Sequence, residues 1–505
     1  MISDRQRYQR LACQTVLAVV AFGFVPVDSQ PQAAELWFGT ATADITPDRP
    51  IPLTGGTSVR IGREIRSRLV ANVLALESRD GDKSLDQAIL VACDLCVIRP
   101  GIQEAFRNYL RERMPEFDPH KLFLAATHTH EAPVLLQDRY DQADYQDAMQ
   151  PKEYVPWLFE QMAQAVEHAW QNRQQGAVAW GLGHAVAGHN RRVTYRDGTV
   201  RMHGNTNDPN FRHIEGFEDH SVHVLCFYDL QEQLQAVALT LATTAQAEGG
   251  SRVSADFWHD ARELIRDRHG DHICVLGFCA PAGDQTPRPQ VYRRAEQRMN
   301  QLRGLSLSQE IGRRVANALT DVAGVIAQDI HTDVPMVHHV QQIDLPARLV
   351  TQAEFEVAKK VCEDIDAKTE RSRSDYWTRS LYRAVMDRYQ AQQQGESLTY
   401  AMELHVIRLG DVAITTSPFE LFLDYGIQIQ ARSPALQTFQ IQLTGALQDH
   451  AYYLPTPRAI LGGALDERPF TNYSATVMNN LVGPEGGQVL VDRTVQAIQQ
   501  LWQDP

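Results

Sequence analysis

Short apolar runs and helix-like periodic segments alternate along the chain. Near-continuous apolar runs at 88–93 and 122–126 are typical of strands that are buried on both faces. Between them, apolar residues recur every three to four positions over 100–114, and a proline follows, which predicts a helix. A strand, a helix and a strand in this order form a βαβ unit, so we expect these two strands to be parallel.

The same periodicities predict the elements of the rest of the chain. Strands are expected at 36–43, 69–77, 236–243, 273–276, 404–409, 412–416 and 439–443. Helices are expected at 155–170, 256–269, 307–328 and 420–432. A further helix should follow the capping box that begins at Thr351. The charged stretch 368–397 should also be helical, and it should be peripheral with a solvated face. The Gly- and His-rich segment 181–207 predicts loop and irregular strand. The pattern indicates an α/β fold, a large mixed domain with mostly buried sheets flanked by helices.

Composition narrows the class of protein. With 505 residues, 43% of them hydrophobic, the chain can build a large core. The formal net charge of -14 argues against nucleic acid as a partner, because nucleic acid requires a basic face. Cys93 and Cys96 have CxxC spacing without a second pair, so they are interpreted as core residues, like the other cysteines, and not as a zinc knuckle or redox motif. The sequence indicates no disulfide pairing.

The N-terminus has the composition of a targeting segment. Arginines precede an apolar stretch at 11–27, and small residues follow at 33–34, which predicts a signal peptide over 1–34. We therefore expect an exported protein, periplasmic or secreted, whose residues 35–505 form one catalytic domain. An uncleaved N-terminal membrane anchor is the alternative.

Two histidines follow the apolar run at 122–126. Side chains alternate along a strand, so His128 and His130 should point to the same face, where two imidazoles begin a divalent metal site. A pair of structural histidines is the alternative interpretation.

Three more polar segments follow predicted strands at their carboxyl ends. They are 279–287 after the strand at 273, 417–420 after the strand at 412, and 448–453 after the strand at 439. In open α/β sheets this edge binds ligands. If the strands are parallel, two histidines, a glutamate, a tyrosine and a Gly-Asp turn converge on one rim.

Five motifs occur in the order seen in neutral/alkaline ceramidases. They are Asp44-Ile45-Thr46-Pro47, Thr127-His128-Thr129-His130, Asn190-Arg191-Arg192, Gly283-Asp284-Gln285-Thr286-Pro287 and Ala451-Tyr452-Tyr453-Leu454-Pro455-Thr456. The chain therefore resembles this family, whose members are zinc amidases that cleave the N-acyl bond of ceramide. The resemblance implies a hydrolase of sphingolipid metabolism that contacts a lipid substrate, with peripheral membrane contact. The chain ends soon after Val491, which leaves no room for the C-terminal β-domain of many ceramidases.

The resemblance also implies roles for individual residues. His128, Glu420 and Tyr453 would be ligands of one zinc ion, with Tyr452 as an adjacent competitor for the tyrosine position. His130 would contact the substrate beside the metal. Arg191 would be the active-site arginine, and Thr286 matches a serine of the catalytic pocket.

The chain departs from the family at the second histidine ligand. Thr244 stands where that histidine is expected, and a neutral hydroxyl is a poor zinc ligand. A histidine from elsewhere could replace it, with His259 as the first candidate. The others are His130, His184, His189 and His450, although His450 could instead pair with Asp449 beside the metal. Phe419 replaces a glycine before Glu420, and Thr286 adds a methyl group to the serine it replaces.

A bound zinc would activate water for attack on an amide carbonyl. Arg191 and His130 would stabilise the oxyanion, Thr286 would position the water or donate to the tetrahedral intermediate, and Asp284 either takes part or only holds its turn. Two alternatives remain open. The chain is a non-catalytic descendant that binds a lipid or glycan, or a hydrolase with altered metal geometry and a different substrate. Bound zinc would separate the hydrolases from the binding protein.

Overall fold

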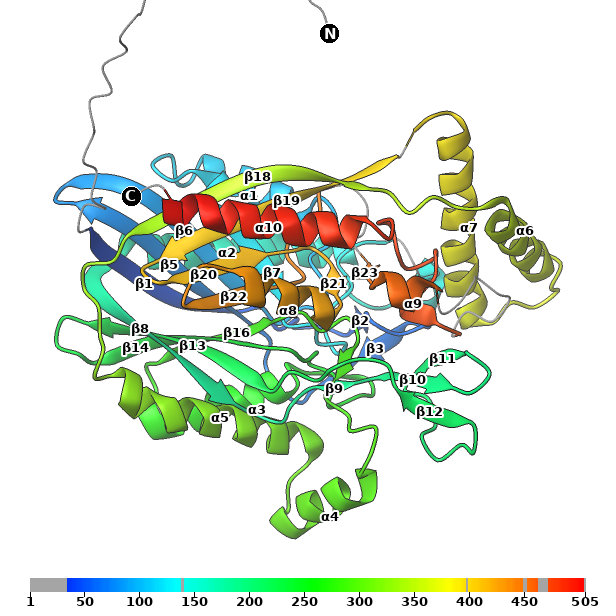
Figure 1. Ribbon diagram of the computed structural model, residues 1–505, viewed down its shortest axis with the longest axis horizontal. Helices are drawn as coiled ribbons and strands as arrows, with labels where there is room; N and C mark the ends of the chain where they lie inside the picture. The colour runs from blue at the N-terminus through cyan, green and yellow to red at the C-terminus, as the bar shows by residue number, and fades with distance from the viewer. Residues whose placement is uncertain (1–33, 138–139, 397, 448–451, 462–470, 504–505) are drawn as a thin grey trace, which may run out of the picture.

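A curved sheet of eight strands organises the molecule. Figure 1 shows the computed structural model, which describes residues 34–137, 140–396, 398–447, 452–461 and 471–503. The strand order is β16-β14-β13-β8-β1-β5-β6-β7. The bounds are β1 (Glu35–Asp44), β5 (Val70–Asp80), β6 (Lys83–Cys93), β7 (Leu122–Ala126), β8 (Gln174–His184), β13 (Ser221–Asp229), β14 (Leu234–Leu241) and β16 (Cys274–Cys279).

The expected βαβ unit is confirmed. β6 pairs with β7 in parallel, with Ile89 opposite Leu122, and α1 (Ile102–Arg111) connects them. β14 and β16 form a second parallel pair at the other edge, with α3 (Phe257–His269) between them. The remaining pairs of this sheet are antiparallel.

Amphipathic helices cover the outer face of the curved sheet in two groups. α1 and α2 (Pro151–Gln171) bury their apolar stripes against β1, β5, β6 and β7. α3 and α5 (Leu307–Ile326) do the same against β8, β13, β14 and β16. The α/β prediction, with sheets flanked by helices, is confirmed.

A second sheet of four strands fills the concave side. It has the order β18-β19-β20-β22, and β20 pairs with β22 in parallel. The bounds are β18 (Met336–Pro346), β19 (Thr399–Leu409), β20 (Val412–Thr416) and β22 (Gln437–Ile441). One face shares a core with the large sheet, and α8 (Leu423–Arg432) and α10 (Gly486–Gln503) cover the other, where Figure 1 shows α10 lying across β18 and β19.

The remaining elements lie around the edge of these layers. A three-stranded sheet has the order β11-β10-β12, and β2–β3, β4–β15, β9–β17 and β21–β23 form two-stranded pairs. Their bounds are β2 (Ile51–Leu53), β3 (Arg60–Gly62), β4 (Glu64–Ile65), β9 (His189–Asn190), β10 (Arg192–Tyr195), β11 (Val200–Met202), β12 (Phe211–Ile214), β15 (Arg252–Val253), β17 (Gln285–Thr286), β21 (Glu420–Leu421) and β23 (Tyr453–Leu454). The other helices are α4 (Arg293–Arg303), α6 (Gln352–Asp366), α7 (Arg373–Gln393) and α9 (Pro457–Leu461).

The prediction of loop and irregular strand at 181–207 was wrong for its first part, which belongs to β8. Glycines there are required by close helix packing rather than by a loop. A Cβ on Gly181 would lie 2.7 Å from a methyl carbon of Ile326, and one on Gly183 would lie 2.8 Å from the Ala318 carbonyl oxygen. Both contacts are to α5, so the glycines let this helix sit directly on the strand.

The expected helix at 420–432 also needs a correction, because α8 begins only at Leu423. Glu420 and Leu421 form the short strand β21 instead. The expected signal peptide lies outside the described residues apart from its last residue, Ala34. Among the helices of the described ranges, none combines the length and apolarity that crossing a membrane requires.

Candidate metal centre and active site

The ends of four strands meet at one rim, as the sequence predicted. Backbone hydrogen bonds join them: the N–H of Ala126 donates to the Leu443 carbonyl at 3.2 Å, and the N–H of Gln442 donates to the Cys279 carbonyl at 2.9 Å. The N–H of Ser417 donates to the Ile441 carbonyl at 2.9 Å. The segments after β7, β16, β20 and β22 are therefore held side by side.

His128 and His130 lie together at this rim, but strand alternation is not the reason. β7 ends at Ala126, and His128 has a φ of 66°, in the left-handed region that interrupts extended backbone. Its N–H donates to the Leu95 carbonyl at 2.9 Å, which ties this turn to the loop after β6. The turn brings the two Nε2 atoms to 3.4 Å.

A carbonyl oxygen fixes the orientation of the His128 ring. Nδ1 lies 2.7 Å from the carbonyl oxygen of Cys96, so Nδ1–H donates there and the lone pair is left on Nε2. Nε2 lies 3.5 Å from Oε2 of Glu420. Burial lowers the pKa of His128, although Glu420 acts in the opposite direction, so the imidazole is neutral at neutral pH.

Glu420 and Tyr453 are brought together by a strand pair that the sequence did not reveal. β21 and β23 are parallel, and Glu420 is the pairing partner of Tyr453. Burial and the nearby Glu420 carboxylate raise the pKa of Tyr453 well above its usual value, so the phenol stays protonated. Oε2 of Glu420 is buried and has no hydrogen-bond partner among the described residues.

The loop after β16 packs against the backbone of Glu420 and Leu421. The N–H of Gly283 donates to the Leu421 carbonyl at 2.8 Å, and a Cβ at this glycine would lie 2.2 Å from the Glu420 carbonyl oxygen. Only glycine permits this approach. Asp284 accepts from the Leu423 N–H at 3.0 Å and from the Asn190 amide at 2.8 Å, which favours the interpretation that it holds its turn.

Arg191 places a buried positive charge beside the carboxylate. Its Nη2 donates to the Gly283 carbonyl at 2.9 Å and lies 3.7 Å from Oε2 of Glu420. Its guanidinium carbon lies 5.8 Å from the ring centre of Tyr453. Arg191, Glu420, Tyr453 and His128 therefore form one contiguous group.

The two threonines of interest are both completely buried. The Thr286 hydroxyl accepts from the Arg288 N–H at 3.4 Å, and Thr286 is not among the described residues that line the hollows at the rim. The Thr244 hydroxyl has no hydrogen-bond partner in the described part of the chain. Thr244 thus offers a metal only a buried hydroxyl.

The candidate replacements for that histidine are mostly elsewhere. His184 is exposed on β8, His189 pairs with Glu218 at 3.1 Å, and His259 is half-buried on α3. Of the histidines proposed, the structure places His130 beside His128. His450 and its neighbour Asp449 lie outside the described residues.

A hollow of about 300 Å³ opens above the polar group. Five aromatic side chains line it, namely Tyr140, Trp377, Tyr452, Tyr453 and Tyr473, together with His128, His130, Arg191 and Glu420. Trp377 comes from α7 (Arg373–Gln393), so the helix expected within 368–397 is present, but it is not only a solvated face. A larger hollow of about 980 Å³ adjoins it beside α4 and shares His130 and Gln246.

Sequence reasoning missed Cys96 and Gln246. The Cys96 sulfur and one ring nitrogen each of His128 and His130 all lie within 4.8 Å of one another. Nε2 of Gln246 lies 2.6 Å from Nε2 of His130. A signal for Cys96 was present: it follows the carboxyl end of β6 just as His128 follows that of the parallel strand β7.

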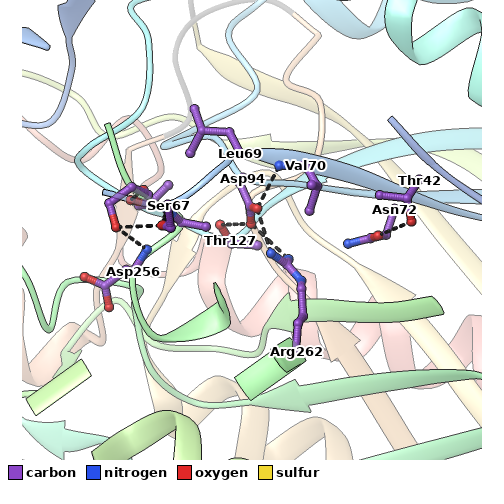
Figure 2. Close-up of polar contacts among 12 residues, drawn as sticks. Thr42, Ser67, Leu69, Val70, Asn72, Asp94, Thr127, Asp256 and Arg262 are labelled. Carbon is purple, nitrogen blue, oxygen red and sulfur yellow. Dashed lines mark hydrogen bonds and ion pairs between the residues drawn. The ribbon is translucent and has the colours of Figure 1, made fainter. Parts of the chain in front are cut away.

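A buried ion pair between Asp94 and Arg262 joins the loops after β6 and β7 (Figure 2). Both Asp94 oxygens accept from the Arg262 guanidinium, at 2.7 and 2.9 Å. Asp94 also accepts from the Val70 N–H at 2.9 Å and from the Thr127 hydroxyl at 3.3 Å. One carboxylate therefore joins β5, the loop after β6, α3 and the residue before His128.

The donor set fits a divalent metal. A tetrahedral zinc holds nitrogen ligands at about 2.0–2.1 Å, which places two such atoms about 3.3 Å apart. The observed separations from His128 Nε2, 3.4 Å to His130 Nε2 and 3.5 Å to Glu420 Oε2, are close to this value. The unpartnered carboxylate oxygen and the neutral imidazoles are in the forms that bind metal.

Comparisons with known proteins support the fold. No protein family model and no curated protein sequence matches the chain. The neutral ceramidase from Pseudomonas aeruginosa is similar in structure, with a TM-score of 0.64 and 16% sequence identity over 92% of this chain and 75% of that chain. A ceramidase complexed with C2 gives a TM-score of 0.64 and 16% identity over 94% and 76% of the two chains. The chain therefore has a ceramidase-like fold.

Proposed function

We propose that this chain is an exported zinc-dependent hydrolase that cleaves the N-acyl bond of a ceramide-like lipid. The observation that carries the proposal is the convergence of His128, Glu420, Tyr453 and Arg191 at one wall of an aromatic hollow. That convergence occurs in a fold whose similar structures are ceramidases. Export rests on the signal-like composition of residues 1–34.

In this proposal His128, Glu420 and Tyr453 hold the zinc. Bound zinc supplies a Lewis acid that polarises a carbonyl and lowers the pKa of water towards about 7. The Cys96 carbonyl keeps His128 Nε2 available, and the Glu420 oxygen that faces it has no hydrogen-bond partner among the described residues. Tyr453 is the pairing partner of Glu420, so its phenol lies at the same point of the rim.

Arg191 and His130 act on the substrate. The Gly283 carbonyl holds the Arg191 guanidinium in place, so its charge is preorganised for an oxyanion that develops beside Glu420. His130 is half-buried and lines both hollows, where it meets a bound amide. Thr286 is given a supporting role in its loop, because it is completely buried.

The aromatic wall suits the apolar part of the substrate. Trp377 and Tyr473 are stacked with ring centres 6.1 Å apart, and Tyr453 meets Tyr473 edge-on at 6.0 Å. Such faces bind hydrocarbon without a polar partner. A lipid of this class is presented by a membrane surface, so peripheral membrane contact is part of the proposal.

A non-catalytic protein that binds a lipid or glycan is the second candidate. The observation that favours it is Thr244, which is buried, has an unpartnered hydroxyl within the described residues, and occupies the position of a histidine ligand. Loss of one strong ligand weakens a catalytic site more than it weakens an aromatic binding hollow.

Hydrolysis of N-acylsphingosine by the full chain tests the proposal. We expect free fatty acid to be released, release to stop with chelator and to return with zinc. Replacing Arg191 with Ala is expected to lower kcat/KM about 100-fold, because an oxyanion donor is lost. Arg201→Ala, a substitution at an exposed position of β11, is the matched control and should leave kcat/KM unchanged. Binding of the lipid without turnover by zinc-loaded protein would contradict the hydrolase and support the second candidate.

A further inference from the structure

Cys96 lies where a thiolate could join the two histidines as a metal ligand. Its backbone carbonyl orients His128 at 2.7 Å, and its sulfur lies within 4.8 Å of one ring nitrogen of each of His128 and His130. Cys96 is buried, and no disulfide is present among the cysteines of the described chain. The sequence places it after β6, next to the histidine loop after β7.

A second observation independently points to a ligand at this point. Oε2 of Glu420 is buried, 3.5 Å from His128 Nε2, and lacks a hydrogen bond from any described residue. Nη2 of Arg191 lies 3.7 Å from this oxygen and compensates its charge, but it gives no hydrogen bond, so the oxygen still has a free site for a metal ion. His128 therefore faces a potential metal position from which both Glu420 and the Cys96–His130 side are within reach.

We propose that Cys96, as a thiolate, is a metal ligand together with His128 and His130, and that it replaces the ligand lost at Thr244. The inference rests on the proposed function only in assuming that the centre binds metal. Thiolate and imidazole both suit zinc, and the Glu420 carboxylate beside His128 is a further ligand type that this ion accepts. Thr244, in the loop after β14, cannot serve, since its group is a neutral hydroxyl.

Two neighbouring groups bear on this assignment. The Asp94–Arg262 pair holds the Cys96 loop and Thr127 on one carboxylate, so sulfur and imidazole are positioned together. Gln246, whose amide lies 2.6 Å from His130 Nε2, must rotate away when that nitrogen binds a metal. His130 then becomes a ligand rather than a substrate contact.

X-ray absorption of the zinc-loaded full chain tests the assignment without a mutation. We expect one sulfur neighbour at about 2.3 Å and nitrogen or oxygen neighbours at about 2.0–2.1 Å. Cobalt loading gives a second readout, because thiolate ligation produces a charge-transfer absorption in the near ultraviolet. Cys96→Ser should abolish this band and raise the metal dissociation constant at least about tenfold. Cys362→Ser, on α6 and outside the lining of both hollows, should leave both unchanged.

The outcomes separate this inference from the proposed function. Zinc without a sulfur neighbour, with metal binding unchanged in Cys96→Ser, overturns the ligand assignment and leaves the hydrolase intact if lipid is still cleaved. A sulfur-ligated metal with no cleavage of N-acylsphingosine supports the assignment and overturns the proposed function. Failure of the full chain to bind zinc or cobalt overturns both.

Discussion

Asp94 is the residue on which most of the local geometry depends. It is completely buried and accepts four hydrogen bonds that join separate segments, two of them from Arg262. Removing one partner of a buried ion pair leaves a charge without compensation, which typically costs 3–5 kcal/mol. We therefore expect Arg262→Ala to lower the free energy of unfolding in urea by about 3–5 kcal/mol.

The matched control for this change is Arg268→Ala on the same helix. Arg268 is exposed and contacts Asn317 and Thr320 on α5. Exposed contacts of this kind contribute about 0–1 kcal/mol. Equal losses of stability in the two variants would contradict the role given to the buried pair.

Single residues of the site were predictable where a motif marked them, and not otherwise. His128, Arg191 and Glu420 stand in segments that resemble a known family, and the structure brings them together. Cys96 was interpreted as core because a lone CxxC pair has no specific meaning. Its place beside the histidines depends on the register of β6 against β7, which a linear pattern does not contain.

At the scale of elements, α7 brings a remote part of the chain to the site. Its Trp377 lines the aromatic hollow, while the neighbouring Tyr376 is exposed. We expect Trp377→Ala to raise KM for N-acylsphingosine about tenfold or more while kcat changes less, because the side chain contacts the lipid and not the reacting amide.

Tyr376→Ala is the control on the same helix turn, and it should leave both kinetic constants within a factor of two or so of the wild type. Circular dichroism of both variants reports whether the helix persists. A fall in kcat with unchanged KM in Trp377→Ala would exclude the substrate-binding role.

Elements with strong patterns were predicted, and elements fixed by distant contacts were not. The strands at 88–93 and 122–126 are continuous apolar runs and became β6 and β7. The end of β8 was predicted as loop because of its glycines, which are required for the close packing of α5. β21 has two residues and exists because it pairs with β23, which no local pattern predicts.

At the scale of the whole molecule, one polar cluster joins the two sheets. Arg107 of α1 donates to both carboxylate oxygens of Glu403 on β19, at 3.0 and 2.7 Å, and to the Leu122 carbonyl of β7. His405 lies 2.8 Å from Glu403 and 2.9 Å from His338 of β18. This cluster connects the first helix layer, the large sheet and the second sheet.

The same cluster predicts how stability depends on pH. Despite the opposing effect of burial, hydrogen bonds from His405 and Arg107 lower the pKa of Glu403 to about 2. The carboxyl binds its proton more readily in the unfolded chain, so its contribution is complete above about pH 4.5 and is lost as pH falls towards 2. That contribution is about 3 kcal/mol, from about 1.4 kcal/mol per pKa unit.

The histidines add an effect of the same sign. Burial lowers the pKa of both His338 and His405, so each binds a proton more readily when unfolded and stability falls as pH drops below about 6.5. We expect the free energy of unfolding to decrease steadily from pH 7 to pH 3. In Glu403→Gln it should be lower by about 3–5 kcal/mol at pH 7, with a smaller difference at pH 3. A difference that does not change with pH would argue against the linkage.

The fold class was predictable because it follows from local periodicity. The apolar runs and amphipathic stretches indicated sheets flanked by helices, and the structure of the similar ceramidase shares this fold. The strand order of the large sheet was not predictable, since β8 and β13 lie between strands that are far apart in the chain. The curvature brings β16 near β7 and so forms the rim of the candidate site, and this curvature depends on the whole core.

The zinc content of the full chain, purified without chelator or affinity metal, tests the central claim most directly. Elemental mass spectrometry should find about one zinc per chain, and His128→Ala should lose it, because this imidazole belongs to every ligand set that the geometry supports. His259→Ala, half-buried on α3 and outside the cluster, should keep it. Absence of metal from the wild-type chain even after incubation with zinc would contradict the account of this rim as a metal centre.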